Sequence, residues 1–153
     1  MHIGSYEKMQ KFVDDYLSSK KVLSILEIGS YDVNGTFKPI FTKKDWTYTG
    51  ADLISGPNVD IVLKDEYNWN EILDNSYDVV ISGSVLEHIE FPWLTICEIK
   101  RVLKINGLTC NIAPSNGFEH RYPKDCYRYY PDGFTALAKW AKLTPIQVYT
   151  DWN

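Results

Sequence analysis

The chain has 153 residues with 44% hydrophobic content, and its 16 basic and 20 acidic residues give a net charge of −4. We expect one domain over residues 1–153, because this length buries a substantial core and is too short for a second substrate domain. The acidic balance disfavours a nucleic-acid partner. No apolar run approaches the roughly 18 residues that span a bilayer, and the N-terminus does not resemble a signal peptide. These features predict a cytoplasmic protein without a membrane partner.

The segment from Ile25 to Gly35, I-L-E-I-G-S-Y-D-V-N-G, is the strongest functional signal. The strand predicted over 22–28 does not alternate polar and apolar residues, which is typical of a strand buried on both faces of a parallel sheet. It ends at Gly29, where the backbone can turn sharply against a ligand, as in nucleotide-type cofactor sites. NAD and FAD are disfavoured, because the G-x-G-x-x-G spacing that they require is absent.

The rest of the chain alternates between apolar and amphipathic segments. Four more strands are predicted at 48–53, 59–63, 77–82 and 108–113. Helices are predicted at 6–17, 70–73, 92–104 and 131–142. The third helix should end at Asn106–Gly107, which tolerate the left-handed conformation, and the segment 145–149 predicts a sixth strand. This alternation is typical of an α/β fold with a parallel sheet.

In this order, the motifs resemble those of the class I S-adenosylmethionine-dependent methyltransferases. The matches are the first motif at Glu27, Ile28, Gly29 and Gly35 and the fourth motif D-V-V-I-S-G-S-V-L-E-H at 78–88. The segments A-P-S-N-G at 113–117 and H-R-Y-P-K-D-C-Y-R at 120–128 are similar to those of a bacterial subset of these enzymes. The resemblance implies an α/β fold, a Rossmann-like three-layer α/β/α sandwich with a mostly parallel sheet of about six strands, lacking the usual final strand.

The resemblance also implies S-adenosylmethionine as the cofactor. Asp52 lies at the end of the second predicted strand, and its two carboxylate oxygens suit the vicinal hydroxyls of a ribose. The alternative for Asp52 is a solvated turn aspartate. By resemblance, Asp65 is a candidate acceptor for the adenine amino group, while small residues at Ser82 and Gly83 would leave room for the methionine part. The residues expected around the cofactor are Glu27, Gly29, Ser30, Asn34, Asp52, Leu53, Asp65, Ser82 and Gly83.

Two histidines are candidate catalytic bases for an acceptor that must lose a proton. His120 lies in the loop after the fifth predicted strand, and its alternative is a loop histidine bonded to a backbone carbonyl. His88 follows the fourth predicted strand, and its alternative is a wall of the cofactor pocket. The histidines lack the spacing of metal ligands, so we expect no metal site.

The loop after the fifth predicted strand also holds the cations Arg121, Lys124 and Arg128. Guanidinium groups match planar carboxylates and phosphates. Arg121, Tyr122 and Arg128 are therefore expected to bind the substrate, a small anionic metabolite or a phosphorylated sugar. The alternative is a solvated basic loop in which Arg128 pairs with Asp125.

Two functions fit this sequence. The first is a methyltransferase that uses S-adenosylmethionine to methylate oxygen or nitrogen of a small-molecule substrate. The second is a catalytically silent S-adenosylmethionine-binding module or oligomer subunit. Because one strand of the usual terminal pair is missing, the sheet edge beside the fifth strand should be exposed, and an exposed edge favours pairing in a homodimer.

Overall fold

The computed structural model describes residues 3–151 and contains five strands and three α-helices within that range. The strands are Leu23–Ile28 (β1), Trp46–Asp52 (β2), Ile61–Val62 (β3), Tyr77–Gly83 (β4) and Leu103–Ile112 (β5). The α-helices are Ile3–Phe12 (α1), Pro92–Val102 (α2) and Pro131–Trp140 (α3). A π-helical turn, Val13–Leu17 (η1), continues α1, and two 3-10 turns lie at Lys38–Phe41 (η2) and Leu86–His88 (η3).

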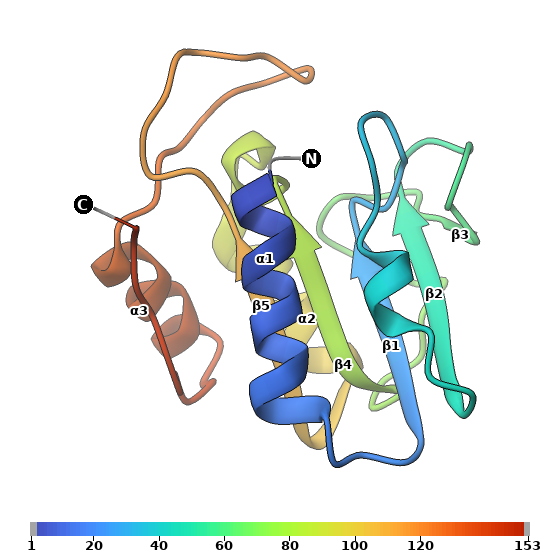
Figure 1. Cartoon of the computed structure of the whole chain (residues 1–153). Coiled ribbons are helices and arrows are strands. Elements are labelled where there is room, and N and C mark those ends of the chain that lie inside the picture. Colours follow the sequence, from blue (N-terminus) through green and yellow to red (C-terminus); the bar gives the residue numbers. More distant parts are fainter. Residues whose placement is uncertain (1–2, 152–153) are drawn as a thin grey trace.

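All neighbouring strands pair in parallel, in the order β3-β2-β1-β4-β5 (Figure 1). The chain winds outward from β1 to β3 and then returns to β4 on the other side of β1. In open α/β sheets, ligands bind at this reversal, outside the carboxyl ends of the strands. The loops after β1, β2 and β4 therefore share the edge of the sheet where a site is expected.

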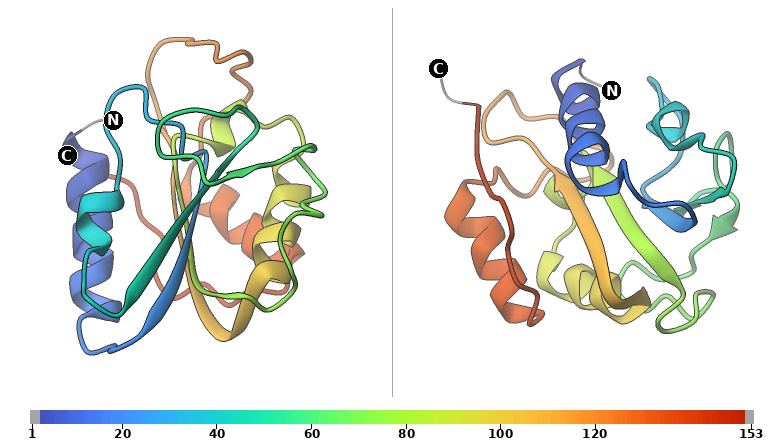
Figure 2. Two further views of the ribbon diagram at one scale, coloured as in Figure 1. Left: turned by 90° about the vertical axis from the view of Figure 1, so that its right-hand side faces the viewer. Right: turned by 60° about the horizontal axis from the view of Figure 1, so that its bottom comes forward.

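The sheet is the middle of three layers, with α1 on one face and α2 and α3 on the other (Figure 2). Alternate side chains of β1 belong to two separate cores: Leu23 and Ile25 pack with Met9 of α1, whereas Leu26 and Ile28 pack in the cluster that contains α2. All four side chains are buried. This arrangement confirms the predicted three-layer sandwich and the burial of β1 on both faces.

The predicted boundary between the third helix and the fifth strand is wrong. The helix ends at Val102, and Asn106–Gly107 lies inside β5, where the register against β4 shifts and Asn106 has φ of 63°. Lys104 explains the early start, because its Nζ lies 2.9 Å from Asp78 Oδ2 at the amino end of β4. Burial opposes ionisation of Asp78, but hydrogen bonds from Ser24 and Lys104 lower its pKa. This contact holds the beginning of β5 against β4.

Two other predicted elements are absent from the described part of the chain. Residues 70–73 form turns instead of a helix, and 145–149 have no strand partner, so the sheet has five strands instead of about six. The segment after α3 is held by α1 and η1 through side chains: Lys8 pairs with Asp151, and the Tyr16 hydroxyl donates to Gln147 Oε1 at 3.4 Å. Its backbone therefore does not complete the ladder beside β5.

Candidate functional site

The turn after β1 requires glycine for two reasons. Gly29 has φ of 71°, in the left-handed region that side chains disfavour. A Cβ built on Gly29 would also lie 2.2 Å from Val85 Cγ2 in the loop after β4. The backbone N–H groups of Gly29 and Ser30 donate to the Ala51 carbonyl at 2.9 and 3.2 Å, so the turn is held against β2.

Asp52 lies at the end of β2, beside this turn. Its Oδ2 accepts a hydrogen bond from the Tyr31 backbone N–H at 3.0 Å, and its Oδ1 accepts one from Ile54 at 3.3 Å. A carboxylate has about four acceptor positions, so capacity remains for two hydroxyl donors. Leu53, the next residue, is 43% exposed. The sheet therefore brings Gly29, Ser30, Asp52 and Leu53 together as the sequence predicts.

Glu27 is buried in the middle of the sheet, paired with Gly50 of β2 and Ile81 of β4. The Glu27 carboxyl accepts a hydrogen bond from the Asn58 side-chain amide, 3.3 Å from Oε2. Burial raises the pKa of Glu27 to about 8, with a smaller contribution from nearby carboxylates, although the bond from Asn58 opposes this rise. The Glu27 carboxyl is therefore mostly protonated at neutral pH.

Asn58 is a residue that our sequence reasoning missed. It has φ of 66°, and its amide nitrogen lies 3.0–3.1 Å from the Ser30 carbonyl, Thr36 Oγ1 and Tyr48 Oη as well as near Glu27. It therefore connects the loop after β1 to the loop after β2. The only local signal is the G-P-N turn at 56–58, which indicates a turn and not a contact with Glu27.

Ser82 and Gly83 end β4, but the structure gives a different reason for their size. The Ser82 hydroxyl donates to Asn111 Oδ1 at 2.8 Å and is buried. A Cβ on Gly83 would lie 2.4 Å from Cε2 of the buried Phe37 ring. These residues are small because Phe37 and β5 pack against them, so contact with a methionine part of the cofactor stays a prediction.

Two of the expected cofactor residues lie apart from this packing. Asp65 is exposed, and its Oδ1 accepts a hydrogen bond from the Tyr67 backbone N–H at 2.6 Å, which closes its own turn. Asn34 is exposed in the loop after β1. A role in cofactor binding stays a prediction for both residues.

A second group of polar side chains lies at the end of β4: Glu87, His88 and His120, here called the Glu-His-His cluster. Glu87 is fully buried, neither of its carboxylate oxygens has a hydrogen-bond partner in residues 3–151, and burial raises its pKa. His88 Nε2 lies 3.8 Å from Glu87 Oε1. The His88 and His120 rings meet edge to face with their centroids 5.0 Å apart. The structure thus brings together the two predicted catalytic histidines.

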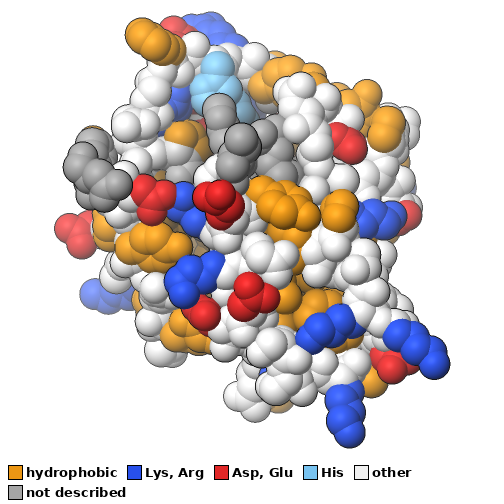
Figure 3. All heavy atoms as spheres, viewed as in Figure 1, with side chains coloured by type: hydrophobic (Ala, Val, Ile, Leu, Met, Phe, Trp, Pro, Cys, Tyr) orange, Lys and Arg blue, Asp and Glu red, His pale blue; other side chains and the backbone are white. Residues whose placement is uncertain are grey.

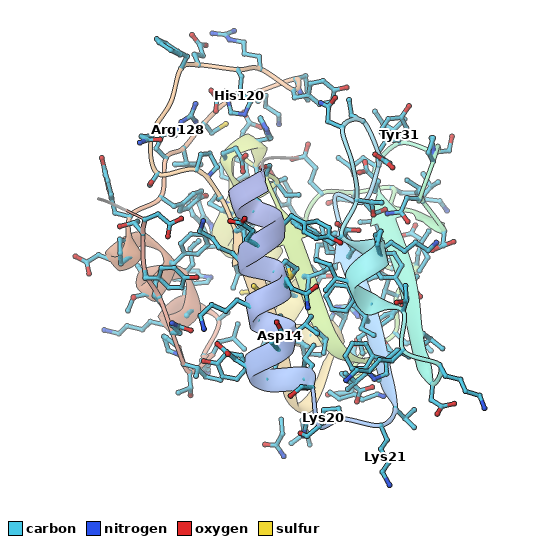
Figure 4. All side chains as sticks on the ribbon, viewed as in Figure 1. Asp14, Lys20, Lys21, Tyr31, His120 and Arg128 are labelled. Carbon is cyan, nitrogen blue, oxygen red and sulfur yellow. The ribbon has the colours of Figure 1, made fainter. Side chains whose placement is uncertain are left out.

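The loop after β5 is held firmly against η3. The backbone N–H groups of Cys126 and Tyr127 donate to the Glu87 carbonyl at 2.7 and 3.2 Å, and the Tyr129 hydroxyl donates to the Leu86 carbonyl at 3.0 Å. Figure 4 shows His120 and Arg128 together on this loop, across the edge of the sheet from Tyr31. His120 is therefore positioned by these bonds and by its own backbone N–H, which donates to Asp125 Oδ2 at 2.7 Å.

Arg128 forms the ion pair with Asp125 that the sequence left as an alternative. Its Nη1 and Nη2 lie 2.6 and 2.8 Å from the two Asp125 oxygens. The Arg128 guanidinium, helped by the His120 backbone N–H, holds the pKa of Asp125 well below its usual range. The other two cations also have acidic partners, since Arg121 Nε lies 2.6 Å from Glu119 and Lys124 pairs with Glu90. Substrate binding by Arg121, Tyr122 and Arg128 stays a prediction.

A groove of about 1050 Å³ runs along the exposed edge of β5. It is lined by residues of α1, β5, α3 and the segment after α3, and it reaches Ser84, Glu87 and His120. Among the described residues on the face seen in Figure 3, acidic and basic side chains are interspersed with hydrophobic ones. The groove therefore connects the open edge of the sheet with the Glu-His-His cluster.

The strand order, the glycine turn after β1 and the carboxylate at the end of β2 define a class I methyltransferase fold. Residues 35–110 match the sequence model of a family described as methyltransferase domain. No curated protein sequence matches the chain. The resemblance to class I S-adenosylmethionine-dependent methyltransferases is confirmed.

Solved structures agree with this fold. A methyltransferase structure from Bacillus halodurans has 14% identity and a TM-score of 0.69, over 90% of this chain and 68% of that chain. An S-adenosylmethionine-dependent methyltransferase from Archaeoglobus fulgidus has 14% identity and a TM-score of 0.65, over 89% and 68%. The (4+2)-cyclase SpnF has 15% identity and a TM-score of 0.67, over 88% and 57%. None of the helices in residues 3–151 has the length and apolarity that a membrane crossing needs.

Proposed function

We propose that residues 1–153 act as one domain that transfers a methyl group from S-adenosylmethionine to an oxygen or nitrogen atom of a small-molecule acceptor. The observation that carries this proposal is the juxtaposition of two groups at one edge of the sheet. The Gly29 turn and Asp52 lie at the carboxyl ends of β1 and β2, where a cofactor would bind. The Glu-His-His cluster follows β4, the strand that neighbours β1.

The residues at the edge of β1 and β2 fit an adenosine group. Asp52 keeps free acceptor positions beside a turn whose backbone N–H groups are already satisfied by β2. These positions suit the two ribose hydroxyls. The hydrogen bond between Glu27 and Asn58 would help to hold the loops after β1 and β2 in place. Because the Glu27 carboxyl is neutral, it would add no charge next to Asp52. When bound, S-adenosylmethionine supplies a methyl carbon on a sulfonium, and the electrons of the broken carbon–sulfur bond stay with sulfur.

The acceptor would reach the cluster at the end of the groove that is lined by Ser84, Glu87 and His120, beyond the strand edge of β5. Its nucleophilic oxygen or nitrogen forms the new bond to the methyl carbon, and its proton passes to His120 or His88. The loop cations already have acidic partners, so an anionic acceptor would have to compete with Glu119 for Arg121. We retain an anionic metabolite or sugar as the acceptor to test first.

The test measures transfer of a labelled methyl group to a panel of hydroxyl, amine and carboxylate compounds, with product masses determined for each. A methylated product from the wild type, lost in His120→Ala and retained in Arg121→Ala, would support the histidine role without an arginine contact. Binding of S-adenosylhomocysteine with no transfer to any acceptor would favour the silent binding module instead. The test is needed because the fold alone does not imply methyl transfer: SpnF, on a similar fold, is a cyclase.

A homodimer through β5 is a separate part of the proposal. Leu108, Cys110 and Ile112 of β5 are only partly buried, and the segment after α3 makes no ladder with this strand. A strand edge with apolar side chains can pair with a second copy.

A further inference from the structure

Folding brings three metal-ligating side chains to one point between η3 and the loop after β5. One ligand atom from each of Glu87, His88 and His120 lies within 4.8 Å of the others. Glu87 Oε1 and His88 Nε2 are already 3.8 Å apart. Ligand atoms of a tetrahedral zinc site lie roughly 3.3 Å apart, so small side-chain rotations would bring all three onto one ion.

Glu87 gives the strongest reason to expect a ligand here. Its side chain is fully buried, and both oxygens lack a hydrogen-bond partner among residues 3–151. Buried carboxylates are nearly always paired or bound to metals, because removing a charge from water is costly. His88 and His120 each place a ring nitrogen within 4.8 Å of a Glu87 oxygen, and these nitrogens would share a cation with Glu87.

His88 is oriented as a metal ligand would be. Its Nδ1 lies 2.5 Å from the Lys124 carbonyl oxygen. A carbonyl can only accept, so Nδ1 carries a proton and donates it, and in the neutral ring the free electron pair is then on Nε2, which lies on the side of Glu87. Metal-binding histidines usually donate their second ring N–H to a carbonyl or carboxylate in this way. For His120, Nδ1 faces the Phe118 carbonyl at 3.4 Å and Asp125 at 3.7 Å, with Arg128 Nη2 also at 3.4 Å.

We propose that Glu87, His88 and His120 bind a divalent transition-metal ion such as Zn²⁺. Two imidazoles and one carboxylate suit Zn²⁺, Co²⁺ or Fe²⁺, whereas Mg²⁺ and Ca²⁺ prefer oxygen ligands alone. Three protein ligands leave a coordination position open, as in catalytic zinc sites. The groove beside β5 reaches both Glu87 and His120 and provides a path for the ion.

The consequence for catalysis rests on the proposed methyl transfer. An acceptor hydroxyl at the open position would lose its proton more readily and would be held in place by the ion. The two histidines would then act as ligands, and the proton of the acceptor hydroxyl would pass to solvent water in the groove, because the ion lowers the pKa of that hydroxyl. Metal binding itself does not depend on this step, so it is measured separately.

The experiment titrates Zn²⁺ and Co²⁺ by calorimetry into the whole chain after treatment with a chelator, and follows Co²⁺ by its absorption spectrum. We expect one ion per chain. Loss of a single outer hydrogen-bond partner lowers metal affinity about 10–100-fold, so His120→Ala, His88→Ala and Glu87→Gln should each lower it by at least about 100-fold. His2→Ala, which removes the third histidine of the sequence, should bind as the wild type does.

The proposal can still be tested if Glu87→Gln, the variant at a fully buried side chain, fails to fold. His120 is exposed, so His120→Ala should keep the wild-type circular dichroism spectrum and still lose the ion. No saturable binding of either ion, or equal affinity in wild type and His120→Ala, would overturn the proposal. Metal binding without methyl transfer would support the site and count against the function only, whereas chelator-resistant transfer would show that the histidines act as bases without a metal.

Discussion

Replacing Glu27 with glutamine should remove a large pH dependence from the stability of the fold. The pKa of Glu27 rises from its ordinary value of 4.5 to about 8 in the folded protein, mainly because of burial. Between these values the unfolded chain has released its proton while the folded chain retains it. Stability therefore falls as pH rises through this window, and the full loss is present above pH 8.

The size of the effect follows from the two pKa values. Each pH unit in the window costs about 1.4 kcal/mol, so the total is on the order of 5 kcal/mol. This is a large share of the roughly 5–15 kcal/mol by which native domains are stable. Glutamine keeps the size of the side chain and can still accept the hydrogen bond from Asn58, but it has no proton to lose.

The assay is urea unfolding at a series of pH values from about 5 to 9. Wild type and Glu27→Gln should have similar stability near pH 5, and the variant should become more stable with each step upward. Glu7→Gln, a change of one exposed carboxylate on α1, controls for the loss of a negative charge. Parallel stability curves for wild type and Glu27→Gln would refute the assignment of a protonated Glu27.

Three further results are expected from the site and the sheet edge. Asp52→Ala should weaken S-adenosylhomocysteine binding by about 2–3 kcal/mol in calorimetry, and unchanged affinity in this variant would show that Asp52 is not part of the site. NAD should give no binding heat with the wild type. Gly29→Val should abolish cofactor binding and also lower the melting temperature, because Gly29 has a left-handed φ and a Cβ there would clash with Val85. Adding Val85→Ala should restore part of the stability, and a Gly29→Val variant as stable as the wild type would contradict this reason. Sedimentation should detect a dimer that a charge at Ile112 in β5 disrupts, and a monomer at all concentrations would exclude pairing through this edge.

Much of the fold could be predicted because its signals are local. The apolar segment 22–28 and the glycine after it identify β1 and the following turn, and Asp52 ends β2 at the spacing that predicts a ribose-binding acid. Parallel strands buried on both faces need long apolar segments, so β1 and β4 stand out in the sequence. The order of these motifs was enough to predict the class of fold.

Elements that depend on distant partners were predicted less well. The segment 145–149 has the composition of a strand, but a strand needs a neighbour, and this segment is instead tied to α1 and η1 by Lys8 and Tyr16. The early start of β5 depends on Lys104 reaching Asp78 across the sheet. Neither contact can be inferred from residues close together in the sequence.

The sequence by itself determined the class of fold, the glycine turn and the carboxylate at the end of β2, because each depends on residues adjacent along the chain. Only the tertiary structure decided which charges are buried and which polar groups meet. Burial gives Glu27 its raised pKa and leaves the Glu87 carboxyl without a hydrogen-bond partner among residues 3–151, and the folding of the loop after β5 onto η3 brings His120 beside His88. The chemistry of the Glu-His-His cluster therefore arises from a contact between segments that are far apart in the chain.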